Sequence, residues 1–220
     1  METYGQIYDE GSKLSSLKKL ANSIRRETQS DVYKFNISFP LIEQQIFVDN
    51  KRLISDIRES GGMSAVTQAK CYRTRWDMHT AYESFWNLGQ VAIEIAKMNP
   101  LAGRSKPDGT PDPIPYGITE SWGLIYNKGN FTSTHSHWPS TWGFVYTVQA
   151  CENCSPLIFD QSDLMGEPVK IVPRTGQMLL FPAWLNHSVP EQQCEHERIK
   201  VAGNLDTAWD FKNRTFYREL

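Results

Sequence analysis

The feature that most constrains the fold is a series of short strand-like segments in the second half of the sequence. Each segment is rich in β-branched and aromatic side chains, and turn-forming residues separate it from the next. The candidate strands are 120–127, 130–137, 142–149, 156–160, 168–172, 177–182, 187–190 and 198–205. About eight short strands at this spacing predict a β-sandwich or barrel, and the jelly roll is the eight-stranded form of that architecture.

The first half of the sequence has a different texture, with helical periodicity and one extended stretch. The predicted segments are a helix over 13–27, a strand-like stretch over 33–48, a short helix from Asp49 or Asn50 to about Ser60, and a longer helix over 78–98. We therefore expect a mainly β protein whose N-terminal helices support the β-core.

A chain of 220 residues has the length of one large domain, and we expect a single domain over 1–220. Its expected parts are a helical and extended support over 1–116, a β-core over 117–205 and a C-terminal tail over 206–220. Four prolines and two glycines between positions 101 and 115 mark residues 99–116 as a loop, which would act as a lid or as a passive connector.

The composition excludes several classes of protein. Hydrophobic residues make up 40% and charged residues 22%, as in a soluble globular protein. The formal net charge of -2 gives no sign of a nucleic-acid or membrane-surface binder. The sequence contains no apolar run of about 20 residues, and its first residues lack the features of a signal peptide. A cytoplasmic location is therefore expected.

Two of the five histidines stand close together, as His135-Ser136-His137. On a strand, residues i and i+2 point to the same face, with Cα atoms roughly 6.5–7 Å apart. Two imidazoles so placed can converge on one metal ion, although the same pattern also suits a polar strand face.

A second string contains a third histidine. Gly176 marks a turn, an apolar strand follows, and His187 comes just after it. Arg198 follows His187 by 11 residues and opens another apolar run. An arginine in a buried strand needs an anion, because an unpaired buried charge is costly. A protein carboxylate or a ligand would supply that anion.

Together these strings resemble the iron(II)- and 2-oxoglutarate-dependent oxygenases. The spacing is most similar to that of the prolyl 4-hydroxylase-like branch, and closest to a group of bacterial and phage oxygenases of unassigned substrate. The elements that carry the resemblance are Tyr126, Gly129, His135-x-His137, the segment Gly176–Phe181, His187 and Arg198. The resemblance is strong over 117–205 and weaker upstream.

The resemblance implies a double-stranded β-helix, which is a cupin-like jelly roll, and an enzyme that uses Fe(II), 2-oxoglutarate and dioxygen. By analogy, His135 and His187 would bind the metal, while Arg198 and Tyr126 would bind 2-oxoglutarate. The implied reaction is hydroxylation of an unidentified small molecule or peptide, with decarboxylation of 2-oxoglutarate to succinate and CO2. Neither the substrate nor the oligomeric state follows from the sequence.

The chain departs from the family motif at His137, where a carboxylate is usual. Three explanations remain open. His137 itself is the third metal ligand, Asp160 supplies a carboxylate from a neighbouring strand, or the site binds a metal such as zinc or nickel without redox chemistry.

The cysteines form a separate pattern, Cys151-x-x-Cys154 and Cys194-x-His196. The resemblance places the two loops that contain them at the same end of the barrel. The four side chains would then form a Cys3His zinc site, the alternatives being free thiols or a disulfide.

Two other readings of the whole chain compete with the oxygenase. One is a three-histidine, cupin-like dioxygenase that does not use 2-oxoglutarate, although the glutamate expected after His-x-His is absent from 138–143. The other is a non-catalytic β-sandwich that binds a partner or has a structural role. For an enzyme, the tryptophans Trp138, Trp142 and Trp184 are candidates to line a substrate cleft.

Overall fold

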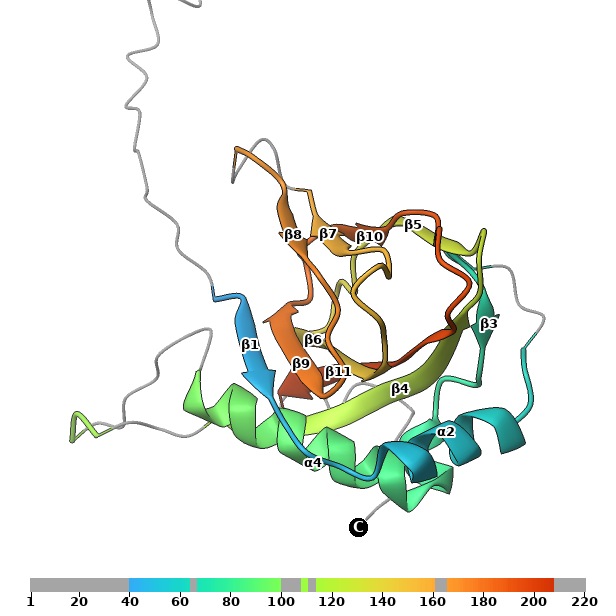
Figure 1. Ribbon diagram of the computed structural model, residues 1–220. Helices are drawn as coiled ribbons and strands as arrows, with labels where there is room; N and C mark the ends of the chain where they lie inside the picture. The colour runs from blue at the N-terminus through green and yellow to red at the C-terminus, as the bar shows by residue number, and fades with distance from the viewer. Residues whose placement is uncertain (1–39, 64–66, 100–107, 111–113, 161–165, 208–220) are drawn as a thin grey trace, which may run out of the picture. The chain divides into compact units, whose positions relative to one another are not determined.

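Two antiparallel sheets face each other in the computed structural model, as the jelly-roll prediction requires (Figure 1). The larger sheet has the order β1 (Ile42–Gln45), β9 (Gln177–Pro182), β6 (Trp142–Gln149), β11 (Arg198–Thr207), β4 (Tyr116–Tyr126) and β3 (Tyr72–Arg73). The smaller sheet has the order β2 (Ala69–Lys70), β5 (Phe131–His135), β10 (His187–Val189), β7 (Leu157–Phe159) and β8 (Val169–Ile171). From β4 to β11, the chain passes repeatedly from one sheet to the other, which is the double-stranded β-helix.

The structure describes residues 40–63, 67–99, 108–110, 114–160 and 166–207. These residues lie within one compact unit, Phe39–Leu220. The predicted helix over 13–27, most of the 99–116 loop and nearly all of the 206–220 tail lie outside the described residues.

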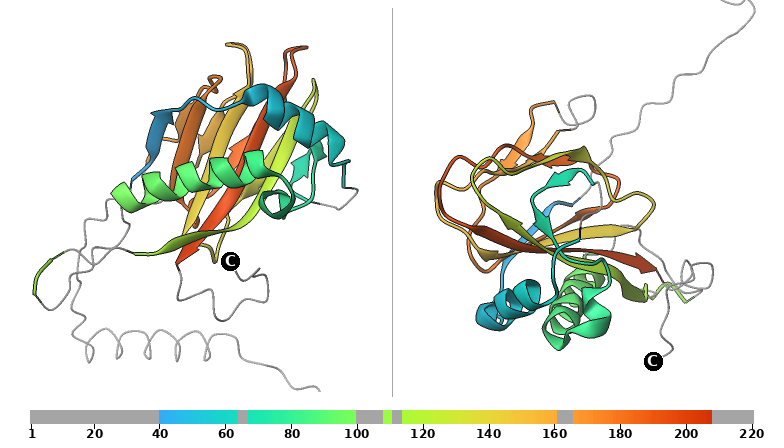
Figure 2. Two further views of the ribbon diagram at one scale, coloured as in Figure 1. Left: turned by 90° about the horizontal axis from the view of Figure 1, so that it is seen from below. Right: turned by 90° about the vertical axis from the view of Figure 1, so that its right-hand side faces the viewer.

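Within the described ranges, three helices accompany the sheets: α2 (Asn50–Glu59), α3 (Met78–Ala81) and α4 (Glu83–Met98). The helices α2 and α4 lie against the outer face of the larger sheet (Figure 2). The predicted cap of α2 is confirmed, because the Asp49 side chain accepts a hydrogen bond of 3.0 Å from the Arg52 backbone N–H. Close approach of α2 to the sheet requires Gly123, where an added Cβ would lie 2.5 Å from Ile57 Cγ1.

The prediction of one helix over 78–98 was wrong, because Tyr82 has an extended backbone and separates α3 from α4. Tertiary contacts hold α3 in its own direction. The His79 backbone N–H donates to Ser121 Oγ at 3.0 Å, and Asp77 forms a β-bridge with the same Ser121 of β4. These contacts override the continuous helical periodicity of the segment.

The larger sheet is buried on both faces, which explains the continuous apolar runs of β6 and β9. In β6, Phe144 and Tyr146 pack under the helices, whereas Val145 faces the smaller sheet. In β11 the same alternation sends Ile199 and Val201 toward the helices. Its other residues, Arg198, Lys200, Ala202 and Asn204, therefore face the space between the sheets.

Candidate active site

Three histidines meet at one end of the space between the sheets. His135 ends β5 and pairs directly with His187 at the start of β10, while His137 follows two residues after His135. The ring centroids are 4.4 Å apart for His135 and His187, 5.4 Å for His135 and His137, and 5.0 Å for His137 and His187. One potential ligand atom of each lies within 4.8 Å of the others, so the three imidazoles could hold one metal ion.

The hydrogen bonds of the three rings determine which nitrogen is free. His135 Nδ1 bonds to the Ser133 carbonyl at 2.9 Å and His187 Nδ1 to the Leu185 carbonyl at 3.0 Å. A carbonyl only accepts, so each Nδ1 is the protonated nitrogen and each Nε2 keeps its lone pair. His137 Nδ1 donates in the same way to Asn204 Oδ1. All three rings are therefore held in the tautomer that a metal ligand through Nε2 requires.

Burial keeps these imidazoles neutral. Desolvation lowers the pKa of His137 from 6.5 to about 4. It lowers the pKa of His187 well below 6.5 and also lowers that of His135. At neutral pH no proton has to leave the cluster before a metal binds.

Two polar residues behind His137 were not predicted from the sequence. Asn204 Oδ1 accepts a hydrogen bond from His137 Nδ1, and the Asn204 amide N–H donates a hydrogen bond of 2.6 Å to Glu120 Oε2. The carboxylate of Glu120 thereby fixes the orientation of the Asn204 amide, with its oxygen toward the histidine. The inward alternation of β11 was the available signal for Asn204.

Asp160, the alternative third ligand, is exposed directly after β7. Among the residues that the structure describes, the histidine cluster includes His137 and does not include Asp160. The structure therefore favours an imidazole in the third position.

Arg198 lies deep in the space between the sheets, with its side chain fully buried. Its Nε, Nη1 and Nη2 all lack a hydrogen-bond partner. Tyr126, its direct partner in the β11–β4 register, places its ring centroid 5.3 Å from the guanidinium carbon. The Tyr126 hydroxyl hydrogen-bonds to Thr132 at 2.6 Å. A buried guanidinium with no partner is costly, so this position calls for an anion that binds from solution.

A second buried basic residue, Lys200, lies two residues along the same strand and was not predicted from the sequence. Burial, and secondly the charge of Arg198, lower the pKa of Lys200 well below 10.5. An Arg-x-Lys pair in an apolar strand was the available signal, because both side chains must share one face.

A cavity of about 540 Å³ lies beside these groups, although Arg198 itself is not among its lining residues. All three histidines, Tyr126, Lys200 and Asn204 line it. Trp138 also lines it, as predicted, but Trp142 and Trp184 do not; Trp142 is instead buried in the core beneath the helices. Two other tryptophans, Trp76 and Trp122, take their place in the cavity wall.

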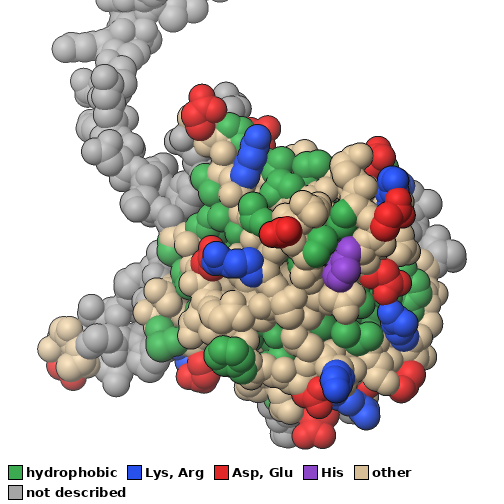
Figure 3. Space-filling model, viewed as in Figure 1, with side chains coloured by type: hydrophobic (Ala, Val, Ile, Leu, Met, Phe, Trp, Pro, Cys, Tyr) green, Lys and Arg blue, Asp and Glu red, His purple; other side chains and the backbone are tan. Residues whose placement is uncertain are grey.

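On the face shown in Figure 3, basic and acidic side chains are interspersed. No helix of the described residues is both long and apolar enough to cross a membrane.

Residues 120–204 match a protein family described as "Putative 2OG-Fe(II) oxygenase". This range runs from Glu120 to Asn204 and contains every residue of the site predicted from the sequence. The matched residues span the β-core from β4 to β11. Enzymes of this family are oxidoreductases that use Fe(II), 2-oxoglutarate and O2. No curated protein matches the sequence.

Solved structures with the same fold include several 2OG-Fe(II) oxygenases. The viral collagen prolyl hydroxylase of Paramecium Bursaria Chlorella virus-1 aligns with a TM-score of 0.56 and 14% identity, over 75% of this chain and 94% of that one. A Pseudomonas putida prolyl-4-hydroxylase aligns with a TM-score of 0.54 and 15% identity, over 77% of this chain and 93% of that one. HygX from Streptomyces hygroscopicus, solved with nickel, 2-oxoglutarate and hygromycin B, aligns with a TM-score of 0.57 and 14% identity. The alignment covers 83% of this chain and 86% of that one. At these identities the likeness concerns the fold.

Proposed function

We propose that this chain is an Fe(II)- and 2-oxoglutarate-dependent dioxygenase in which His135, His137 and His187 hold the metal. In the same proposal, Arg198, Tyr126 and Lys200 hold 2-oxoglutarate, and the enzyme hydroxylates a small molecule or peptide. The observation that carries it is the buried guanidinium of Arg198, whose three nitrogens have no partner. That feature distinguishes a 2-oxoglutarate enzyme from a cupin-like dioxygenase, which needs no buried anion site.

The donor set fits Fe(II). Three neutral imidazoles with free Nε2 atoms can occupy one face of the ion, and imidazole is a ligand that suits iron. They leave its 2+ charge uncompensated, and the carboxylate of 2-oxoglutarate that is not bound by Arg198 would compensate part of it. We therefore expect Fe(II) and 2-oxoglutarate to bind cooperatively.

When bound, Fe(II) and 2-oxoglutarate would supply oxidative chemistry: 2-oxoglutarate would lose CO2 to give succinate, with one oxygen atom of O2 entering succinate and the other a C–H bond of the substrate. The contributions of this chain are positional. Arg198 and Lys200 would bind the remote carboxylate, and Asn204 holds the His137 ring in its metal-binding tautomer. Leu157 and Val189 in the cavity wall keep water from the reacting centre.

The substrate would enter past Trp76 and Trp138. Both tryptophans line the cavity, and their side chains are also exposed to solvent, so they lie at its outer end. We further propose a cytoplasmic location, where reducing conditions would keep the cysteines as thiols.

The test is an anaerobic titration of metal-free protein with Fe(II) and 2-oxoglutarate, monitored through the visible charge-transfer band of the chelated cosubstrate. We expect a band that His187→Ala abolishes and that needs more 2-oxoglutarate in Arg198→Ala. Stoichiometric iron binding without a band would indicate a cupin-like dioxygenase. Absence of iron binding would indicate a non-catalytic β-sandwich.

A further inference from the structure

A second cluster of metal-ligating side chains joins two connections between strands. Cys151 and Cys154 lie in the turn that follows β6, and Cys194 lies between β10 and β11. The Sγ–Sγ distances are 3.5 Å for Cys151 and Cys154, 3.7 Å for Cys151 and Cys194, and 3.8 Å for Cys154 and Cys194. With Zn–S bonds of about 2.3 Å, two sulfur ligands of a tetrahedral zinc lie about 3.8 Å apart. The three thiols thus stand at the spacing that one zinc ion requires.

His196 supplies a fourth ligand. A ring nitrogen of His196 and the sulfurs of Cys151 and Cys154 all lie within 4.8 Å of one another. The His196 side chain is exposed, so its ring can rotate onto the open side of the three sulfurs. Three thiolates and one imidazole form a common ligand set of structural zinc sites.

Several N–H groups of the surroundings point at the sulfurs. Gln192 is fully buried, and its side-chain amide donates to Cys194 Sγ at 2.8 Å and to Cys154 Sγ at 3.3 Å. The Ser155 backbone N–H donates a hydrogen bond of 3.0 Å to Gln192 Oε1 and so fixes the direction of this amide. The Cys151 backbone N–H also donates to Cys154 Sγ at 3.3 Å. Such N–H donors stabilise the negative charge of metal-bound sulfur.

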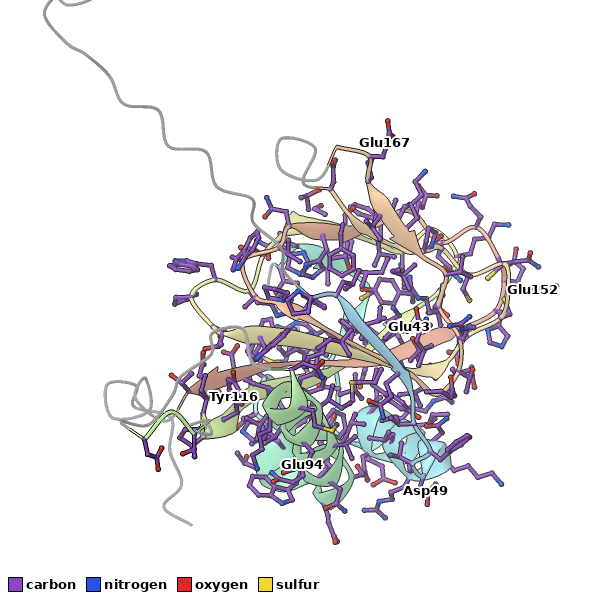
Figure 4. All side chains as sticks on the ribbon, turned by 90° about the vertical axis from the view of Figure 1, so that its left-hand side faces the viewer. Glu43, Asp49, Glu94, Tyr116, Glu152 and Glu167 are labelled. Atoms are coloured by element: carbon purple, nitrogen blue, oxygen red, sulfur yellow. The ribbon has the colours of Figure 1, made fainter. Side chains whose placement is uncertain are left out.

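We propose that Cys151, Cys154, Cys194 and His196 bind one structural zinc ion. All four ligands come from the protein, so the ion has no open position for catalysis. The turn with Cys151 and Cys154 is at the periphery of the molecule, where Figure 4 labels Glu152 between them. The zinc ties this turn to the connection between β10, the strand that begins at His187, and β11, the strand that begins at Arg198.

The experiment measures zinc by elemental mass spectrometry in the full-length protein, purified under reducing conditions and washed with a weak chelator. We expect stoichiometric zinc in the wild type and a loss of at least tenfold in Cys154→Ser and Cys194→Ser. Cys71→Ser is the matched thiol control, because Cys71 is the one cysteine outside the cluster. His135→Ala tests for zinc held at the histidine triad. Both controls should retain the full zinc content.

A spectroscopic measurement on the wild type keeps the test valid if the cysteine variants fail to fold. The zinc absorption edge should report a first shell dominated by sulfur at about 2.3 Å. Cobalt loaded in place of zinc should give thiolate-to-metal charge-transfer bands. The proposal is overturned by trace zinc in the wild type, by zinc lost with His135→Ala, by a shell of nitrogen and oxygen only, or by a disulfide between the clustered cysteines in freshly purified protein.

Discussion

Among single residues, Arg198 contributes an unfavourable term to the free energy of folding until an anion pairs with it. We therefore expect Arg198→Met to leave the ligand-free protein as stable as the wild type, or about 1–3 kcal/mol more stable, because an unpaired buried charge is removed. The same variant should bind 2-oxoglutarate at least about 30-fold more weakly, since loss of a buried charge partner costs about 2 kcal/mol or more. Thermal unfolding with and without 2-oxoglutarate, with Mn(II) in place of iron, measures both effects. A strongly destabilised ligand-free variant whose response to 2-oxoglutarate is unchanged would contradict the assignment.

Asn204 is expected to act on the metal through His137. Asn204→Leu removes the acceptor of the His137 Nδ1–H and frees the ring to turn, so Fe(II) affinity should fall about 10–100-fold. Glu120→Gln is the matched variant, because its amide oxygen can still accept from Asn204, and its effect should be smaller. Fe(II) dissociation constants, measured anaerobically by competition with a chelator, compare the two. Equal losses in both variants would show that the charge of Glu120 matters more than the orientation of the ring.

The residues of the site differ in how far the sequence could predict them. His135 and His137 were proposed from their i, i+2 spacing, and His187 and Arg198 because each stands beside an apolar run. Asn204 and Lys200 were missed, since a single polar residue in a strand has meaning only once the inward face of β11 is known. Trp76 and Trp122 were missed for a similar reason. The fold brings both side chains into the cavity wall, where their ring centroids are 4.5 Å apart, although 46 positions separate them in the sequence.

The elements were predicted best where their own residues determine them. The bounds of β6 and β9 agree with the predicted 142–149 and 177–182, because continuous apolar runs between turn residues define both strands. The two-residue strands β2 and β3 were missed, since so short a segment has no periodicity. The division between α3 and α4 depends on contacts with β4, which no local pattern encodes.

The packing of α2 on β4 gives a prediction at this scale. A methyl group at Gly123 would collide with Ile57, so Gly123→Ala should lower the free energy of unfolding by about 1–3 kcal/mol. Ile57→Ala should cost about 2–5 kcal/mol, because Ile57 is fully buried. In the double variant the new methyl fills part of the space left by Ile57, so the total loss should be smaller than the sum of the two. Urea unfolding of the four proteins gives the coupling energy, and strict additivity would show that the two residues are not in contact.

For the whole molecule, the order of strands could be expected only from the resemblance to a known fold. Neighbours in the larger sheet such as β1 and β9 lie more than 130 residues apart in sequence, as the pairing of Ile42 with Leu180 shows. Hydrophobic periodicity indicates which face of a strand is buried and leaves its partner undetermined. The same closure brings His135 beside His187 and buries the histidine cluster, with consequences for stability that the sequence did not indicate.

Burial of the histidines makes the stability of the metal-free protein depend on pH. The pKa of His137 falls from 6.5 in the unfolded chain to about 4 in the folded protein, so in this interval the unfolded state binds a proton that the folded state does not. The free energy of unfolding should therefore fall as the pH drops below 6.5, by up to about 1.4 kcal/mol per pH unit for each such histidine. Urea unfolding between pH 7 and 5 with a chelator measures this slope. In His137→Gln the slope of the free energy of unfolding against pH should be less steep, by up to about 1.4 kcal/mol per pH unit, because one proton fewer is taken up on unfolding. An unchanged slope would mean that His137 titrates normally in the folded protein.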